Sequence, residues 1–377
     1  MISSLIRFYT FLPWLAFAIA VLAFVLPARV RWRGKIAWTL VLALCSAKFP
    51  VFSIWGKSAY YPELPLPIVL GWTTASLAVA ILAVLSLVWW VRKGREIALP
   101  TLAALLSLGG LWSGTCTPTV RTLDLAFPNL PPHLEGYRIV QISDLHVSSC
   151  MRRERTEKIV QVANSLSPDL ICLTGDLVDG PPPKVGTFLE PIRNLQAHDG
   201  VWAITGNHEY FENTNPHKPW QSLYDQWGIR FLANTCIFPQ QGLAVAGVND
   251  PQVLRRKTDA SDSDPFFRPP DVTQAFSLAT NGEFRILLDH RPTNARTNLE
   301  THGVDLQLSG HSHGGSLPLI ANLVAQDCDG YVSGLYRFGS RALYVSNGAG
   351  QTGAFPFRYF TPSEITCMTL RRAEPQP

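Results

Sequence analysis

Charged residues are scarce in this chain of 377 residues. Only 16% of its residues are Asp, Glu, Lys or Arg, against about 25% in an ordinary soluble domain. The first 115 residues hold just two acidic residues and none of the nine histidines, yet they hold eight of the eleven tryptophans. Such an uneven shortage of charge, with 47% apolar residues, excludes a disordered chain and a single small soluble domain.

The sequence also lacks a basic polar domain. Residues 1–115 carry ten Lys and Arg against two acidic residues, whereas residues 116–377 carry 22 against 26. The basic excess lies in the most apolar part of the chain, which argues against nucleic-acid binding. Six of the seven cysteines follow residue 115. An exported domain can pair some of them, but the sequence does not choose among the many connectivities.

The N-terminal part of the chain contains long segments without any charged residue. Residues 8–28 and 64–91 form uncharged segments of 21 and 28 residues, each long enough for the helix of about 20 residues that crosses a bilayer. Ile36 to Gly56 contains Lys48, and Ile97 to Thr115 is shorter; these are weaker candidates. We expect residues 1–115 to form a transmembrane anchor of about four helices.

The loops on the two sides of these segments differ in basic residues. Residues 29–35 and 92–95 hold seven Lys and Arg, against Arg7, Lys57 and Arg121 on the other side. Because loops rich in Lys and Arg stay in the cytoplasm, four spans would place both termini outside. We expect a multi-pass protein of the bacterial plasma membrane, with its polar domain on the periplasmic or extracellular side.

After about residue 118, short apolar runs alternate with amphipathic stretches, which is typical of an α/β domain with buried strands. Residues 116–136 predict a linker and residues 137–377 a catalytic domain, in which Arg152 to Leu166 is the clearest helix. Eight runs predict strands: Tyr137–Ser143, Leu170–Thr174, Val201–Thr205, Leu243–Val248, Phe284–Leu288, Asp305–Leu308, Leu343–Val345 and Ile365–Leu370.

Potential metal ligands follow five of these strands. They are Asp144, His146, Asp176, Asn207, His290, His311 and His313. Because ligands bind beyond the carboxyl ends of the strands in an open α/β sheet, these side chains are expected to converge. Imidazole, carboxylate and one amide without cysteine suit Mn²⁺, with Fe and Zn²⁺ as alternatives. Seven ligands are too many for one ion, and two ions sharing a carboxylate serve phosphoester hydrolysis.

The five motifs occur in an order that resembles a known protein family. The motifs are D-x-H at Asp144, G-D at Asp176, G-N-H-E at Asn207, a histidine at His290 and G-H-x-H at His311. This series resembles the calcineurin-like metallophosphoesterase superfamily over about residues 118–377. Leu287 to Pro292 and Ser346 to Gly350 are further similar to its bacterial membrane-associated branch. Each motif alone is weak, but five in order are specific.

The resemblance implies an αββα sandwich with two divalent metal ions. One implied ion is held by Asp144, His146, Asp176 and His313. The other is held by Asp176, Asn207, His290 and His311, so that Asp176 bridges the pair. His208 is implied to stabilise the transition state or to protonate the leaving oxygen without binding metal. Asp289 departs from the family pattern and is a candidate for tuning the charge of the second metal site.

Each of these residues also has an ordinary structural interpretation. A single aspartate after a strand is usually a turn or cap residue, and a single histidine is usually a hydrogen-bonded polar group. Seven together favour a metal centre. Arg152, Arg153 and Arg155 can either bind substrate phosphates or form a solvated helix face. Lys48 can contact a lipid phosphate or extend towards the membrane interface.

These patterns predict a membrane-anchored phosphoesterase that hydrolyses phosphodiester or pyrophosphate bonds. We favour lipid-linked substrates, because an active site near the bilayer meets them at a high effective concentration. A second hypothesis assigns soluble phosphomonoesters or nucleotides as substrates, with the helices as a tether. A third, of another class, is a non-catalytic membrane receptor for a phosphate ligand.

Overall fold

The structure is a computed structural model that describes residues 12–48, 64–88, 95–210, 217–255, 264–280, 282–315, 321–351 and 355–373. Its helices are α2 (Trp32–Ser46), α4 (Leu66–Val88), α5 (Arg95–Thr115), α6 (Arg153–Ser165), α7 (Pro182–Leu189), α8 (His217–Gln226), α9 (Val272–Ala275), α10 (Ala295–Glu300) and α11 (Ala321–Asp327). Its strands are β1 (Thr119–Phe127), β2 (Arg138–Ile142), β3 (Leu170–Thr174), β4 (Val201–Ile204), β5 (Arg230–Phe231), β6 (Thr235–Gln240), β7 (Leu243–Gly247), β8 (Phe284–Leu288), β9 (Leu306–Ser309), β10 (Gly334–Phe338), β11 (Arg341–Val345) and β12 (Glu364–Arg372).

The strands form two six-stranded mixed sheets, in the orders β1-β12-β2-β3-β4-β5 and β10-β11-β9-β8-β7-β6. Strands β2 to β5 run parallel in the first sheet, and β7, β8, β9 and β11 run parallel in the second. Each of the eight predicted strands is present, with ends that differ by at most two residues. They were predictable because buried parallel strands are short, continuous apolar runs.

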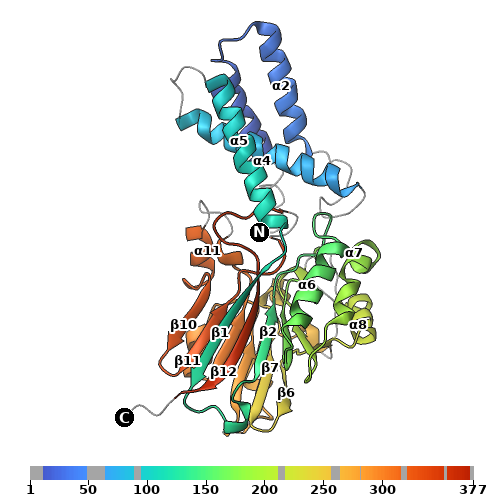
Figure 1. Cartoon of the computed structure of the whole chain (residues 1–377), viewed down its shortest axis with the longest axis vertical. Helices are drawn as coiled ribbons and strands as arrows, with labels where there is room; N and C mark the ends of the chain where they lie inside the picture. The colour runs from blue at the N-terminus through green and yellow to red at the C-terminus, as the bar shows by residue number, and fades with distance from the viewer. Residues whose placement is uncertain are drawn as a thin grey trace.

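A central apolar core holds the two sheets together. Ile139 and Leu170 of the first sheet meet Val245, Ile286 and Leu306 of the second in one buried cluster. The outer face of the first sheet packs on α6, α7 and α8, which lie side by side in Figure 1. The outer face of the second sheet packs on α9 and α10. The layers are therefore helix, sheet, sheet and helix, and the expected α/β class is confirmed.

The N-terminal part is helical. Two helices of the described residues are long and apolar enough to cross a membrane, Leu66–Val88 and Glu96–Thr115, whereas four spans were expected. A shorter apolar helix covers Leu12–Val25, and α2 has only 15 residues. The start of the first expected span and the end of Ile36 to Gly56 lie outside the described residues.

Lys48 differs from both expectations for it. Its side chain is buried, with 1% exposed, and its ammonium group donates to the Thr73 hydroxyl on α4. The Thr73 hydroxyl in turn donates to the Val69 carbonyl of its own helix at 2.6 Å. This lysine therefore joins the end of α2 to α4.

Residues 116–136, expected to be a linker, contain strand β1. It pairs in parallel with β12 over nine residues and leads directly from α5 into the first sheet (Figure 1). The strand escaped prediction because it lies at an edge, where most of its side chains are exposed and the apolar pattern is weak. The helical part thus continues into the sheet through a short connection of three residues.

Candidate metal centre

The seven predicted ligands come from the carboxyl ends of five strands in both sheets. Asp144 and His146 follow β2, Asp176 follows β3, Asn207 follows β4, His290 follows β8, and His311 and His313 follow β9. All except His311 are buried, with at most 7% exposed. Parallel strands bring their carboxyl ends to one edge, so residues far apart in sequence meet there.

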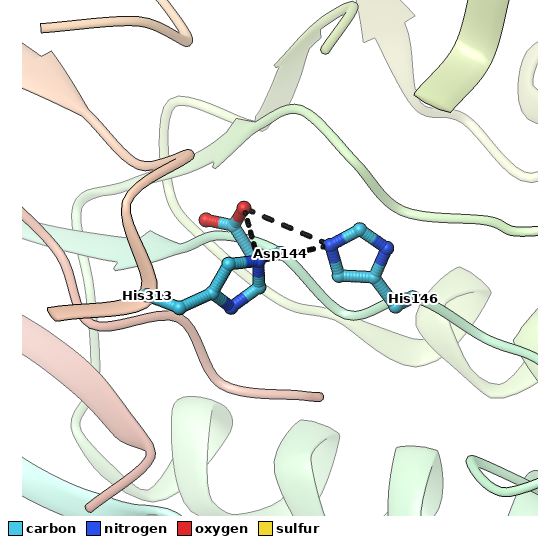
Figure 2. Close-up of side chains that lie close together, drawn as sticks. All are labelled: Asp144, His146 and His313. Atoms are coloured by element: carbon cyan, nitrogen blue, oxygen red, sulfur yellow. Dashed lines mark hydrogen bonds and ion pairs between the residues drawn. The ribbon is translucent and has the colours of Figure 1, made fainter. Parts of the chain in front are cut away.

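One group of ligand atoms is formed by Asp144, His146 and His313. Figure 2 shows both imidazole rings turned towards the Asp144 carboxylate. The two Nε2 atoms are 3.2 Å apart, and the Asp144 Oδ1 atom lies 3.4 Å from that of His313 and 3.9 Å from that of His146. Donors about 2.1 Å from one ion lie about 3 to 3.5 Å from each other. The spacing therefore fits three ligands of a single ion.

A second group is formed by Asp176, His290 and His311. The Asp176 Oδ2 atom lies 3.3 Å from His290 Nε2 in this group and 3.5 Å from His146 Nε2 in the first. The same carboxylate oxygen is thus near both groups. This is the position that a bridging ligand requires.

Two orphaned polar atoms point to the same chemistry. The Asn207 Oδ1 and His290 Nε2 atoms are buried and make no hydrogen bond among the described residues, and His290 Nε2 meets Asp176 only as an ion-pair contact at 3.3 Å. Buried polar atoms are nearly always satisfied, so such exceptions need an explanation. An amide oxygen and an imidazole nitrogen are both metal ligands, and the residues present therefore fit a pair of divalent ions.

The electrostatics of the cluster favour bound cations. Burial alone lowers the pKa of His290, but the charge of Asp176 outweighs burial and raises that pKa to about 10. Burial also opposes protonation of His146, whose pKa the carboxylate of Asp179 raises to about 9. A field that stabilises protonated histidines at these positions stabilises a metal cation equally well.

The loops that present the ligands are held in an uncommon backbone conformation. Five predicted ligands have positive φ angles of 48° to 68°, in the left-handed region that few residues other than glycine adopt. They are Asp144, His146, Asp176, His311 and His313. Gly175, at φ 87°, precedes one of them, and a Cβ there would lie 2.7 Å from His290 Nδ1. Backbone strain of this kind is common where a site is preorganised.

His208 lies beside the first group but is oriented by a different carboxylate. Its Nδ1 atom is 2.6 Å from Asp179 Oδ1, and the same oxygen is 2.8 Å from His146 Nδ1. Burial raises the pKa of Asp179, but the two histidines outweigh it and lower that pKa to about 2. The contact of Nδ1 with Asp179 therefore fixes the orientation of the His208 ring.

The comparisons with known proteins agree with this geometry. Residues 137–315 match the model of the family described as calcineurin-like phosphoesterase. A Bacillus subtilis metallophosphoesterase, YkuE, is 32% identical over 64% of this chain and 82% of its own length. The chain belongs to the calcineurin-like metallophosphoesterases. This family consists of metal-dependent phosphoester hydrolases that use a pair of divalent ions.

Other relatives share more of this chain but less of their own length. A Helicobacter pylori metallophosphoesterase is 32% identical over 69% of this chain and 66% of its own length. A zebrafish (Danio rerio) protein named transmembrane protein with metallophosphoesterase domain is 30% identical over 72% of this chain and 62% of its own length. The chain thus spans just under two thirds of these relatives.

The metallophosphoesterase site contains structural residues that the sequence did not single out. Asp179 is one, because nothing in its local sequence marks it as a partner for two histidines. Glu209 is another, although it belongs to the G-N-H-E motif. Its buried carboxylate accepts from the backbone N–H groups of Asp176, Leu177 and Gly206, at 2.7 to 2.9 Å. Glu209 thereby ties the loop after β3 to the loop after β4.

Asp289, the departure from the family pattern, faces away from the ligand atoms. Its Oδ2 atom accepts from Asn298 on α10 at 3.4 Å, because neighbouring residues of an extended segment point to opposite sides. Burial and the charge of Asp250 raise its pKa to about 7. Asp250 itself forms a two-pronged ion pair with Arg291, at 2.8 and 3.2 Å.

A buried arginine connects the first ligand group to helix α5. Arg358 is 1% exposed, and its Nη2 atom lies 3.5 Å from His313 Nδ1 and donates to the Gly348 and Gly350 carbonyls. The Arg358 backbone N–H donates to Gly110 of α5 at 3.1 Å. No local pattern revealed this arginine, because its contacts with His313 and Gly110 join residues that are far apart in the sequence.

Proposed function

We propose that this metallophosphoesterase is embedded in a membrane and hydrolyses phosphodiester or pyrophosphate bonds of lipid-linked substrates. The observation that carries the proposal is the position of the candidate centre. It lies at the edge of the sheets nearest the N-terminal helices (Figure 1), and the segment that carries Arg358 contacts both α5 and His313. A substrate held at the bilayer surface would therefore reach the centre over a short distance.

We assign one metal ion to Asp144, His146, Asp176 and His313, and the other to Asp176, Asn207, His290 and His311. Manganese is the preferred ion for this set of imidazole, carboxylate and amide ligands, with Fe and Zn²⁺ as alternatives. When bound, such a pair supplies a nucleophilic water and neutralises charge on the phosphoryl oxygens. The protein's own contribution is to hold the ligand atoms at fixed positions through the loops described above.

His208 is the proposed catalytic residue outside the ligand sets. Asp179 fixes the ring through Nδ1, which leaves Nε2 as the atom that donates a proton to the leaving oxygen. The side chain is 18% exposed, so a substrate can approach it. General acid catalysis of this kind contributes about a hundredfold to ten-thousandfold to the rate.

Exposed apolar side chains support the membrane placement. Nineteen of the 26 large apolar side chains that are exposed in the described residues lie between Leu12 and Trp112. Soluble monomers rarely expose contiguous apolar patches of this kind, and two helices are long and apolar enough to span a bilayer. We retain four spans as the proposed topology, with the catalytic domain on the periplasmic or extracellular side of a bacterial plasma membrane.

The test is hydrolysis by detergent-purified full-length protein loaded with Mn²⁺. Chromogenic phosphodiester and phosphomonoester substrates establish the ester class. Lipid phosphoesters in mixed micelles, beside soluble nucleotides, establish the substrate class. The proposal expects turnover that requires Mn²⁺ and favours the lipid substrates. Efficient cleavage of nucleotides without cleavage of lipid phosphoesters would refute the lipid-linked substrate and leave the helices as a tether.

The receptor hypothesis gives a different result in the same assay. A receptor would retain two metal ions per chain and bind phosphate but show no turnover with any divalent ion. Membership of a family of hydrolases and the presence of His208 and Asp179 in contact argue against it.

A further inference from the structure

A cavity with an apolar wall and several charged side chains lies at the junction between the helical part and the catalytic domain. It has a volume of about 150 Å³, and its walls include Leu66 and Leu70 of α4 together with Arg152, Glu154, Arg155 and Lys158 at the start of α6. None of these residues belongs to the groups of metal-ligating atoms. The cavity is thus distinct from the groups of ligand atoms.

The basic residues of the cavity occupy one side of α6. Arg155 and Lys158 are three positions apart on α6, so they share a helix face. Arg152 precedes the helix as its N-cap and donates to the Leu64 carbonyl at 2.6 Å. Arg153 points elsewhere and forms ion pairs with Glu157 at 2.8 Å and Glu190 at 2.6 Å. The arginine cluster of the sequence therefore divides into one solvated residue and two that face the helical part.

Positive charge in the cavity is not balanced. Three basic side chains line it, against the single carboxylate of Glu154. Arg155 donates through its terminal nitrogens to the Gly114 carbonyl and to the Ser363 hydroxyl. Its Nε atom is buried and has no hydrogen-bond partner in the described part of the chain. A guanidinium N–H in this state requires an acceptor.

The opposite wall is apolar and belongs to a candidate membrane helix. Leu66 and Leu70 lie on the first turns of α4, and Arg155 contacts Gly114 near the end of α5. If these helices span the bilayer as proposed above, the cavity lies at the level of the lipid headgroups. A volume of about 150 Å³ holds a ligand the size of benzene, which is enough for a phosphate group but not for a whole lipid.

We propose that this cavity binds the phosphate group of an anionic phospholipid, with Leu66 and Leu70 against the adjoining glycerol and first methylene groups. Basic pockets beside membrane helices bind anionic headgroups in this manner. The inference rests on the membrane placement in the proposed function. A free phosphate ion offers the same acceptor oxygens, so the experiment must separate the two sources.

The experiment is native mass spectrometry of the full chain in a neutral detergent, titrated with phosphatidylglycerol or phosphatidylcholine. We expect one phosphatidylglycerol per chain and weaker binding of phosphatidylcholine. Arg155→Gln and Lys158→Gln should each weaken phosphatidylglycerol binding about tenfold, the effect of one lost charge-assisted contact. Arg153→Gln removes the same charge from the same helix outside the cavity and should leave binding unchanged.

Two further arms keep the test decisive. Leu70→Trp fills the cavity without changing its charge and should abolish phosphatidylglycerol binding, which tests the proposal even if Arg155→Gln fails to fold. Inorganic phosphate is titrated alone and in competition. Equal phosphatidylglycerol binding by all variants would overturn the proposal, as would equal binding of both lipids. Phosphate that binds as tightly as phosphatidylglycerol would overturn the lipid assignment.

The outcome does not depend on catalysis. His208→Ala should bind phosphatidylglycerol normally, because His208 is not a lining residue. Absence of turnover in the unmutated protein, with phosphatidylglycerol still bound, would refute the proposed function and leave the cavity assignment standing. Normal turnover, together with equal phosphatidylglycerol binding by the cavity variants and Arg153→Gln, would refute the cavity assignment and leave the proposed function standing.

Discussion

The helical part and the catalytic domain satisfy their buried polar groups in different ways. In the helices, hydroxyl groups donate to carbonyls one turn away in the same helix, as Ser86 does to Leu82 and Ser107 to Ala103. In the catalytic domain, the partners are remote. The Gln141 amide on β2 bonds to Ser309 on the other sheet, 168 positions later.

This difference shows what each region is built to do. Local hydroxyl bonds let a helix lie in an apolar environment without needing partners from elsewhere. Remote bonds fix the strand ends relative to each other, which a metal centre requires. The two regions meet where the segment around Arg358 packs on α5 and where Arg155 donates to Gly114, so these contacts are places where one region can affect the other.

The largest effect is expected for Asp176→Asn, because Asp176 lies beside both ligand groups. The substitution should reduce metal content and lower kcat/KM on the order of a thousandfold or more. Elemental analysis and the phosphodiester assay measure the two effects. Asp225→Asn makes the same chemical change at an exposed position and should do neither. Retention of two metals with activity within tenfold of the parent would contradict the bridging assignment.

His208→Ala should separate catalysis from metal binding. We expect kcat to fall by about a hundredfold or more, while two metal ions per chain remain, since His208 belongs to neither proposed ligand set. The matched control is His198→Ala, whose side chain is 76% exposed and pairs only with Asp199 among the described residues. Metal loss in His208→Ala equal to that in Asp176→Asn would instead make it a ligand.

Gly114→Leu tests the contact between the two regions. A Cβ at Gly114 would collide with the carbonyl of Pro356, whereas one at Gly109 would meet open space. We expect Gly114→Leu to displace the segment around Arg358 and to lower kcat about tenfold or more, with unchanged helix content by circular dichroism. Gly109→Leu should have normal activity. If both variants have the same activity, the activity of the catalytic domain does not depend on the contact between α5 and the segment around Arg358.

The smallest effects are expected from removing one buried polar group in each region, one with remote hydrogen-bond partners and one with a local partner. Gln141→Met removes bonds of 2.9 Å to Thr174 and Ser309 and should cost about 1 to 3 kcal/mol in the free energy of unfolding. Ser107→Ala removes one local bond and should change it by less than about 0.5 kcal/mol. Thermal midpoints of full-length protein in the same detergent provide the comparison. A larger loss for Ser107→Ala would reverse our view of the two regions.

Much of this protein was predictable from local sequence. Buried parallel strands are apolar runs, so eight strands were found, and the ligand motifs follow them directly. The uncharged segment 64–91 identified α4, and the weaker candidate Ile97 to Thr115 corresponds to α5. The uncharged segment 8–28 corresponds to a shorter apolar helix, Leu12–Val25, among the described residues. Strand β1 was missed because an edge strand with exposed side chains leaves little apolar pattern.

The tertiary structure alone decided which side chains act together. The proximity of one Asp176 oxygen to both ligand groups, the contacts of Asp179 with two histidines, and the contact of Arg358 with His313 join residues from separate strands and loops. The cavity beside Arg155 likewise needs α4 and α6 to meet. Periodicity and motifs record the environment of each segment, whereas distances between segments are set by how the sheets and helices pack.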